Sequence, residues 1–268
     1  MESIQVDTSD RIRLSGVHLP YEGERTHALD LGFVLGHGFT ASTRRPTVRR
    51  IAARLARHGG VVAVDFRGHG LSAGRSTAGD AEVLDVDAAV AYGRRLGYRR
   101  VATVGFSMGG AVMVRHAGGA TTARGLAPVE PVDAVVSVSA PSRWYIRDTL
   151  PMRRVHWLLE SRSGRLVSAA VLRTRIGGQW VDVPESPVRA AARIPPTPLL
   201  VVHGDRDAFF GPEHGRALAG AAGWPGGAAE LWEVAGFGHA EGAATPALVD
   251  RIGRWAAVAT HSPGTMRL

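Results

Sequence analysis

The stretch Val101–Val112, which reads VATVGFSMGGAV, decides the fold of this chain of 268 residues. A run of apolar, largely β-branched residues leads into Gly-X-Ser-X-Gly, and a segment rich in Ala, Val and Met follows. This order is typical of a strand, a sharp turn and a helix, with Ser107 held in a strained conformation at the turn. A side chain at Gly105 or Gly109 would collide with the neighbouring strand or helix. We therefore predict that Ser107 is a nucleophile.

Strand patterns and helix patterns alternate on both sides of this stretch. Short apolar runs typical of buried strands lie at 31–36, 61–66, 134–138, 198–203 and 229–234. Apolar residues with helical spacing lie at 47–58, 81–96, 213–222 and 246–258. Two further short strands are expected at 3–6 and 11–19. The alternation predicts the α/β class, with a mostly parallel sheet that has helices on both faces.

The alternation breaks at residues 143–195, where we find no strand pattern and expect helical pieces at 155–159 and 166–172. We interpret this segment as a helical cap inserted into one core, which comprises residues 1–142 and 196–268. The segment holds ten Arg and four acidic residues, a net charge of +6 out of +8 for the whole chain. These arginines are either the solvated face of the cap helices or a positive rim above Ser107 that attracts anionic substrates.

The composition excludes several kinds of site. The chain has no Cys and no Lys, which removes disulfides, thiolate metal sites, a cysteine nucleophile and lysine Schiff-base chemistry. A metal site is conceivable from His37, Asp65, His69 and His239. None of these residues, however, lies at helical metal-ligand spacing. We therefore expect no metal and no cofactor.

The charge and hydropathy patterns also limit the partners. Although the net charge is +8, no basic run is interleaved with aromatic residues, so we expect no nucleic-acid partner. No apolar stretch approaches the roughly 18 residues that span a bilayer, and the start of the chain does not resemble a signal peptide. We therefore expect a cytoplasmic protein without an integral membrane segment.

A serine hydroxyl is a weak nucleophile at neutral pH, so Ser107 needs a base and a group that orients this base. Asp207 follows one predicted strand, and His239 lies in the loop after the next. The order Ser, Asp, His is the one found when all three lie at the carboxyl edge of one parallel sheet. Asp205 is a competing acid. We prefer Asp207, because a residue beyond the tight turn at Gly204 can point back across the strand ends.

Acyl transfer passes through an oxyanion, which requires N–H donors aimed at the developing charge. The backbone N–H of Met108, at the start of the helix after the turn, is one expected donor. The second is that of Phe39, in the loop after the strand at 31–36. His37 lies in the same loop, and we interpret it as a hydrogen-bonding brace instead of a second base.

Together these motifs resemble those of the α/β-hydrolases over nearly the whole chain. The resemblance is carried by HGF at 37–39, DFRGHGLS at 65–72, GFSMGG at 105–110, HGDRD at 203–207 and GH at 238–239. It implies an eight-stranded, mostly parallel sheet, a serine triad and a cap similar to that of monoacylglycerol lipase-like and other small esterases. One departure is the acid loop, which usually continues into a Val-Pro-like pair and here reads AFFGP at 208–212. We expect the aromatic pair to narrow the pocket beside the acid.

The resemblance implies a serine hydrolase that cleaves a small-molecule carboxylic ester, of the esterase or lysophospholipase kind, through an acyl-enzyme on Ser107. Thioesterases, peptidases and cofactor-free haloperoxidase-like proteins have the same triad and are alternatives. Dehalogenases and epoxide hydrolases are disfavoured, because their nucleophile is a carboxylate. The alternative from another class is a non-catalytic ligand-binding protein that retains the fold.

Overall fold

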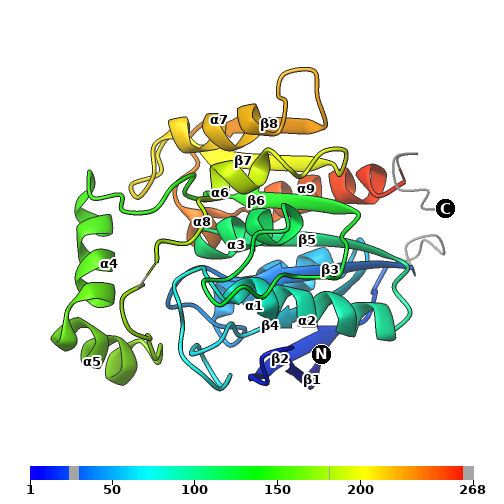
Figure 1. Cartoon of the computed structure of the whole chain (residues 1–268). Helices are drawn as coiled ribbons and strands as arrows, with labels where there is room; N and C mark the ends of the chain where they lie inside the picture. Colours follow the sequence, from blue (N-terminus) through cyan, green and yellow to red (C-terminus); the bar gives the residue numbers. More distant parts are fainter. Residues whose placement is uncertain (24–29, 181, 262–268) are drawn as a thin grey trace.

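The computed structural model describes residues 1–23, 30–180 and 182–261. The strands of this part are β1 (Glu2–Asp7), β2 (Arg13–Leu19), β3 (Leu31–Gly36), β4 (Gly60–Val64), β5 (Arg100–Phe106), β6 (Ala134–Val138), β7 (Leu199–Gly204) and β8 (Ala229–Val234). They form one eight-stranded sheet in the order β1-β2-β4-β3-β5-β6-β7-β8 (Figure 1). Strands β3 to β8 are parallel, and β2 is antiparallel to both of its neighbours. The predicted mostly parallel sheet is thus confirmed.

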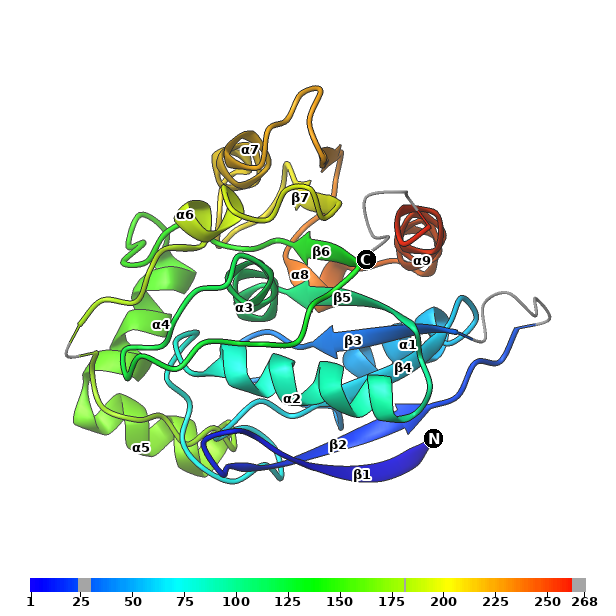
Figure 2. The same cartoon turned by 45° about the vertical axis from the view of Figure 1, so that its right-hand side comes forward.

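Helices cover both faces of the sheet. The helices of the described residues are α1 (Pro46–Leu55), α2 (Glu82–Arg95), α3 (Met108–Ala117), α4 (Leu150–Glu160), α5 (Arg162–Val171), α6 (Pro187–Ala191), α7 (Pro212–Ala221), α8 (Ala240–Ala243) and α9 (Pro246–Ala259). On one face, α2, α3, α6 and α7 pack over a core that includes buried side chains of β4 to β7. On the other, α1, α8 and α9 pack over a second core (Figure 2). The two cores explain why the central strands are apolar without alternation.

The register of the parallel strands brings their carboxyl ends to one edge of the sheet. Gly36 at the end of β3 pairs with Gly105 in β5, and Gly204 at the end of β7 pairs with Val234 at the end of β8. The loops that carry the predicted site residues follow these strand ends directly. This edge is therefore where residues from distant parts of the chain can meet.

Helices α4 and α5 lie together at one end of the sheet, apart from the helices on its faces (Figure 1). Both begin earlier than their apolar spacing predicted, because a hydroxyl caps each N-terminus. Thr149 accepts the N–H of Met152 at 3.4 Å, and Ser161 accepts the N–H of Gly164 at 2.8 Å. A proline in the first turn of α4 also favours an early start.

The last helix of this segment, α6, is short and packs against the core, unlike α4 and α5. It has only five residues, too few for helical periodicity to be read from the sequence, and no helix was expected there. Its residues Ala190 and Ala191 are fully buried in the core beside α3. The segment 143–195 thus leaves the sheet with α4 and α5 and returns to it with α6.

Candidate active site

The turn between β5 and α3 has the strained geometry that its glycines suggested. Ser107 has φ 51° and ψ −118°, a backbone conformation that is rare for a residue with a side chain. A Cβ on Gly105 would lie 2.3 Å from the carbonyl oxygen of Gly109, and a Cβ on Gly109 would lie 2.5 Å from that of Gly36. Only glycine fits at these two positions, because the helix begins directly against the strand ends.

The structure brings Ser107, His239 and Asp207 into one hydrogen-bonded series. Nε2 of His239 lies 3.0 Å from Oγ of Ser107, and Nδ1 lies 2.9 and 2.8 Å from the two carboxylate oxygens of Asp207. A carboxylate only accepts, so Nδ1 carries the proton and Nε2 is left to accept one from the serine hydroxyl. This is the tautomer that a general base for Ser107 requires.

The carboxylate of Asp207 is held by more than the histidine. Its side chain is fully buried, and Oδ1 accepts the N–H groups of Phe209 at 2.8 Å and Phe210 at 3.1 Å. Burial alone would raise the pKa of Asp207, but the hydrogen bond and charge of His239 together with the two N–H groups lower it below its ordinary value. Asp207 therefore stays ionised at neutral pH, and these hydrogen bonds fix the orientation of its carboxylate toward His239.

Asp205, the competing acid, has another position. It is exposed, and its Oδ1 accepts the N–H of Gly236 at 2.7 Å. This bond joins the turn after β7 to the turn after β8. The structure gives Asp205 no hydrogen bond to the imidazole.

The aromatic pair in the acid loop covers the histidine. The ring of Phe209 stacks on that of His239 with centroids 4.1 Å apart at 24°, and Phe210 meets the same ring edge-on at 5.5 Å. Both phenylalanines also line the cavity above Ser107. The departure from the usual acid loop thus shields the imidazole from water and leaves its two hydrogen bonds in place.

The two expected oxyanion donors border the same cavity. Met108 is the first residue of α3, so its N–H belongs to the first turn, where a helix has no internal acceptors. Phe39 follows β3 and is half-buried. Within the described part of the chain, neither N–H has a protein acceptor. Both are therefore available to an oxygen atom bound near Ser107.

His37 braces the loop that carries Phe39. Its ring is fully buried, Nδ1–H donates to the carbonyl of Gly38 at 2.8 Å, and Nε2 accepts the N–H of Phe66 at 3.1 Å. Burial lowers the pKa of His37 to about 4, so the ring is neutral at physiological pH. With both nitrogens engaged, His37 cannot serve as a base for Ser107.

Glu241 is a member of the site that sequence reasoning missed. Its Oε1 accepts the N–H of Gly38 at 2.6 Å, and burial raises the pKa of this carboxyl group. A side chain at Gly38 would meet both Glu241 Oε2 and Ser107 Cβ, at 3.2 and 3.3 Å, which shows how close the three residues lie. The only signal in the sequence was an acidic residue shortly after His239, and helix first turns commonly contain one.

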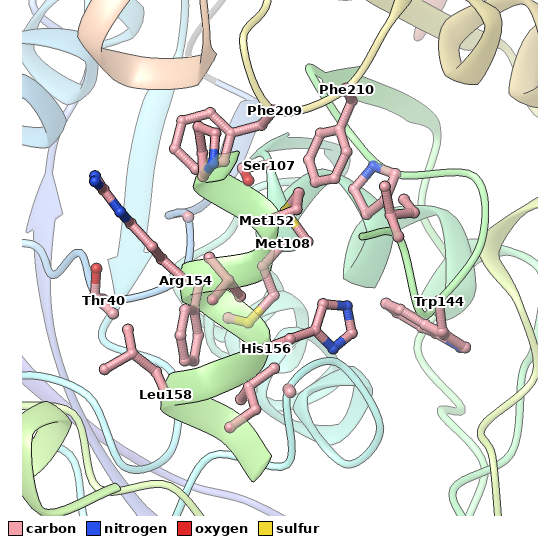
Figure 3. A pocket seen from close by; sticks show the side chains of 18 of the residues that line it. Thr40, Ser107, Met108, Trp144, Met152, Arg154, His156, Leu158, Phe209 and Phe210 are labelled. Carbon is pink, nitrogen blue, oxygen red and sulfur yellow. The ribbon is translucent and has the colours of Figure 1, made fainter. Parts of the chain in front are cut away.

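A cavity of about 460 Å³ opens above Ser107 (Figure 3). Its walls come from the loop after β3, the acid loop, the segment after β6 and helix α4. Most of the lining side chains are apolar or aromatic, and those from the segment after β6 onward include Trp144, Tyr145, Ile146, Met152, Val155, Leu158, Leu159 and Trp180. Such a lining suits an apolar or aromatic group bound next to the serine.

The arginines of residues 143–195 are divided between several environments. Arg143 and Arg154 line the cavity. Arg147 pairs with Glu160 at 2.6 Å, and Arg193 forms a two-pronged pair with Glu185 at 2.6 and 2.7 Å. Of the ten arginines, Arg147 and Arg193 are thus paired with carboxylates of the same segment, which still holds a net charge of +6.

Two further observations concern the described residues only. No group of three or more His, Cys, Asp or Glu side chains among them could hold a metal ion. None of their helices is both long enough and apolar enough to cross a membrane.

Several solved structures are similar to the chain. The esterase Pf2001 of Pyrococcus furiosus is 22% identical, with a TM-score of 0.70 over 95% of this chain and 90% of that one. A serine hydrolase homologue from Coxiella burnetii is 18% identical, with a TM-score of 0.59 over 96% of each chain. Est1E of Butyrivibrio proteoclasticus, solved with ferulic acid, is 15% identical, with a TM-score of 0.58 over 95% and 96%. At these identities the similarity shows the fold.

No curated protein matches the sequence significantly. The sequence model of the alpha/beta hydrolase family, by contrast, matches residues 33–251, which include every strand from β4 to β8 and all three members of the Ser-His-Asp series. Together with the sheet order and the turn at Ser107, this match shows that the chain belongs to the alpha/beta hydrolase family.

Proposed function

We propose that the protein is a serine hydrolase that cleaves carboxylic esters through an acyl-enzyme on Ser107. The observation that carries the proposal is the position of His239, with Nε2 3.0 Å from the serine hydroxyl and Nδ1 bonded to Asp207. A hydroxyl, a base and an orienting carboxylate in this series can generate a nucleophile at neutral pH. The solved esterase Pf2001, which shares the fold, supports the same reaction class.

The reaction follows from these positions. Oγ of Ser107 attacks the ester carbonyl while its proton moves to Nε2 of His239. The tetrahedral intermediate then collapses, and the proton on Nε2 passes to the departing alkoxide, which leaves as an alcohol. Water attacks the acyl-enzyme in the same way, with its proton taken by His239, and the carboxylic acid and free Ser107 are released.

Charge develops twice in this sequence, and the site has groups for both places. The N–H groups of Phe39 and Met108 would bind the oxyanion, and the N-terminal end of α3 adds its positive dipole. The carboxylate of Asp207 would stabilise the imidazolium, and its lowered pKa keeps it charged throughout. Removing one oxyanion donor typically costs a factor of about 10²–10³ in kcat.

The cavity indicates which part of the substrate is recognised. Its aromatic and aliphatic lining favours an apolar or aromatic group next to Ser107 over a peptide or a charged group at that position. The binding of ferulic acid by Est1E shows that a related fold accommodates an aromatic acid. We also infer that residues 143–195 act as a cap, because α4 contributes Met152, Val155 and Leu158 to the cavity wall.

A series of p-nitrophenyl esters from acetate to dodecanoate tests the proposal. We expect the wild-type protein to hydrolyse the esters with an optimum in chain length and a burst of p-nitrophenol, and Ser107→Ala to lose about 10⁴-fold or more of kcat. Circular dichroism should show the same fold for both proteins. Absence of hydrolysis by the wild type, or equal hydrolysis by Ser107→Ala, would contradict the proposal.

A further inference from the structure

A second cavity, of about 280 Å³, lies next to the catalytic one. Thr40 lines both, so the two cavities share a wall one residue after the expected oxyanion donor Phe39. The second cavity is formed by the loop after β3, the loop after β4 and the end of α5. Its lining residues are Thr40, Ala41, Ser42, Arg44, Arg45, Gly70, Leu71, Val171, Leu172 and Arg173.

Three of these residues are arginines, and no carboxylate lines the cavity. Arg44 and Arg45 come from the loop before α1, whereas Arg173 comes from the end of α5, so they converge from segments far apart in the sequence. Within the described part of the chain, no acidic side chain pairs with any of the three guanidinium groups. Like charges gathered without counter-charges suit a ligand that brings its own negative charge.

The backbone around the cavity adds to its positive character. Helix α1 begins at Pro46 with Arg45 as its N-cap, and it has neither a side-chain cap nor an acidic residue in its first turn. The free N–H groups and the positive end of its dipole are therefore not neutralised by the chain itself. Arg173 has φ 52° just after α5, where glycine would be favoured.

The carboxylate of Asp65 holds two walls of this cavity together. It is fully buried, Oδ1 accepts the N–H of Thr43 at 2.6 Å, and Oδ2 accepts that of Leu71 at 3.0 Å. Both carboxylate oxygens of Asp65 are thus bonded to backbone N–H groups, and the residue does not line the cavity. The cavity is a built feature of the fold, because a buried hydrogen-bonded group sets the distance between its two loops.

We infer that this arginine-lined cavity binds an anionic group, a carboxylate or a phosphate, of the ester that reacts at Ser107. The inference rests on the proposed function. Figure 3 shows Thr40 and Arg154 on one side of α4 and Trp144 on the other, so a further arginine lies on the side of the second cavity. An amphipathic ester would place its apolar part in the catalytic cavity and its anionic end beyond Thr40.

Two matched pairs of esters test this inference and locate the anion. The p-nitrophenyl monoester of octanedioic acid and p-nitrophenyl octanoate differ by a carboxylate on the acyl side. The 4-carboxymethylphenyl and phenyl esters of octanoic acid differ by one on the alcohol side. For each pair we compare kcat/KM of the anionic ester with that of the neutral one, in the wild type, in a cavity variant and in a control variant of equal charge.

The cavity variant is Arg44→Gln, Arg45→Gln and Arg173→Gln, and the control is Arg50→Gln, Arg153→Gln and Arg162→Gln, at exposed positions that line neither cavity. For at least one pair we expect the ratio to fall about tenfold or more in the cavity variant, and to change less than about twofold in the control. Raising the salt concentration should lower the ratio in the wild type and control only. Arg173→Gly, which suits the left-handed backbone, is a second cavity variant.

Equal ratios in the cavity and control variants for both pairs would overturn the inference while the proposed function stands. If the wild type hydrolyses none of the esters, the proposed function fails, and calorimetry of monomethyl octanedioate against the neutral methyl octanoate, with and without the cavity substitutions, then tests the cavity directly. Tighter binding of monomethyl octanedioate that is lost in the cavity variant supports the anion site. Equal binding of the anionic and the neutral ester contradicts it.

Discussion

At the level of single residues, the proposed chemistry depends on His239, which presents a different nitrogen to each of its two partners. Asp207 fixes the proton on Nδ1, and this leaves the lone pair of Nε2 facing Ser107. The side chain of the nearby Asp205 instead accepts the N–H of Gly236. Two aspartates that are neighbours in the sequence therefore have different tasks, because the chain turns between them.

The roles of the two aspartates can be separated by substitution. Asp207→Asn should lower kcat by about 10⁴-fold, because an amide that donates to Nδ1 imposes the wrong tautomer. Asp205→Asn should lower it less than about threefold, since its bond to a backbone N–H survives in an amide. Steady-state kinetics on one ester at pH 8 measures both. A crippled Asp205→Asn beside an active Asp207→Asn would show that the acid is misassigned.

Glu241 offers a second prediction at this level. Its bond to the N–H of Gly38 positions the loop that carries Phe39, so Glu241→Ala should lower kcat about tenfold with a smaller change in KM. Glu241→Gln keeps an oxygen acceptor and should retain kcat within about threefold. If Gln is as damaging as Ala, the charge or proton of Glu241 is what matters, and the positioning role is wrong.

The residues of the site differ in how far the sequence could predict them. Ser107 was predictable because its turn requires glycines at fixed positions, and His239 and Asp207 because each follows a strand that ends at the same edge. Glu241 was not, since its contact with Gly38 joins residues about 200 positions apart and depends on how α8 packs. No local pattern marks such a contact.

At the level of elements, α4 is the helix that shapes the cavity above Ser107. It is capped by Thr149 and contributes Met152 to the wall of the cavity that contains Ser107 (Figure 3). Apolar spacing predicted a helix here but placed its start too late, because a cap acts through one hydroxyl and leaves no periodic signal. The helices α6 and α8 were not predicted, because five and four residues are too few to show helical periodicity in the sequence.

The position of α4 predicts how acyl-chain selectivity can be changed. Met152→Trp should reduce kcat/KM for p-nitrophenyl dodecanoate about tenfold or more relative to the acetate, because the larger ring fills space that a long chain needs. The matched control is Arg153→Trp, which places the same ring on the exposed side of α4. Equal chain-length profiles for the two variants would show that α4 does not border the acyl group.

At the level of the whole molecule, stability depends on histidines that the fold keeps neutral. Burial lowers the pKa of His69 to about 4, and the neighbouring His37 contributes to this shift. The ring centroids of His37 and His69 lie 5.1 Å apart. In the unfolded chain each histidine has a pKa near 6.5. Between about pH 6.5 and about pH 4 the unfolded state therefore binds more protons than the folded state. The free energy of unfolding consequently decreases as the pH falls through this range.

A comparison with His69→Gln measures the contribution of His69 and removes that of titrating groups that do not interact with it. On going from pH 7 to pH 5, the free energy of unfolding of the wild type should fall by about 2 kcal/mol relative to that of the variant, which cannot take up this proton. Urea titrations at the two pH values measure the difference. A pH-independent gap would mean that His69 is already protonated or exposed in the folded protein.

The measurement that bears most directly on the proposed chemistry is the site of covalent labelling by a fluorophosphonate. Intact-mass and peptide analysis should show one adduct per chain, located on Ser107, because this hydroxyl lies at the cavity and is bonded to Nε2 of His239, whose Nδ1 is bonded to Asp207. Ser107→Ala should not be labelled, and His239→Ala should be labelled far more slowly. A folded wild-type protein that takes up no label, or a Ser107→Ala protein labelled to the same extent, would contradict the assignment of Ser107 as the nucleophile.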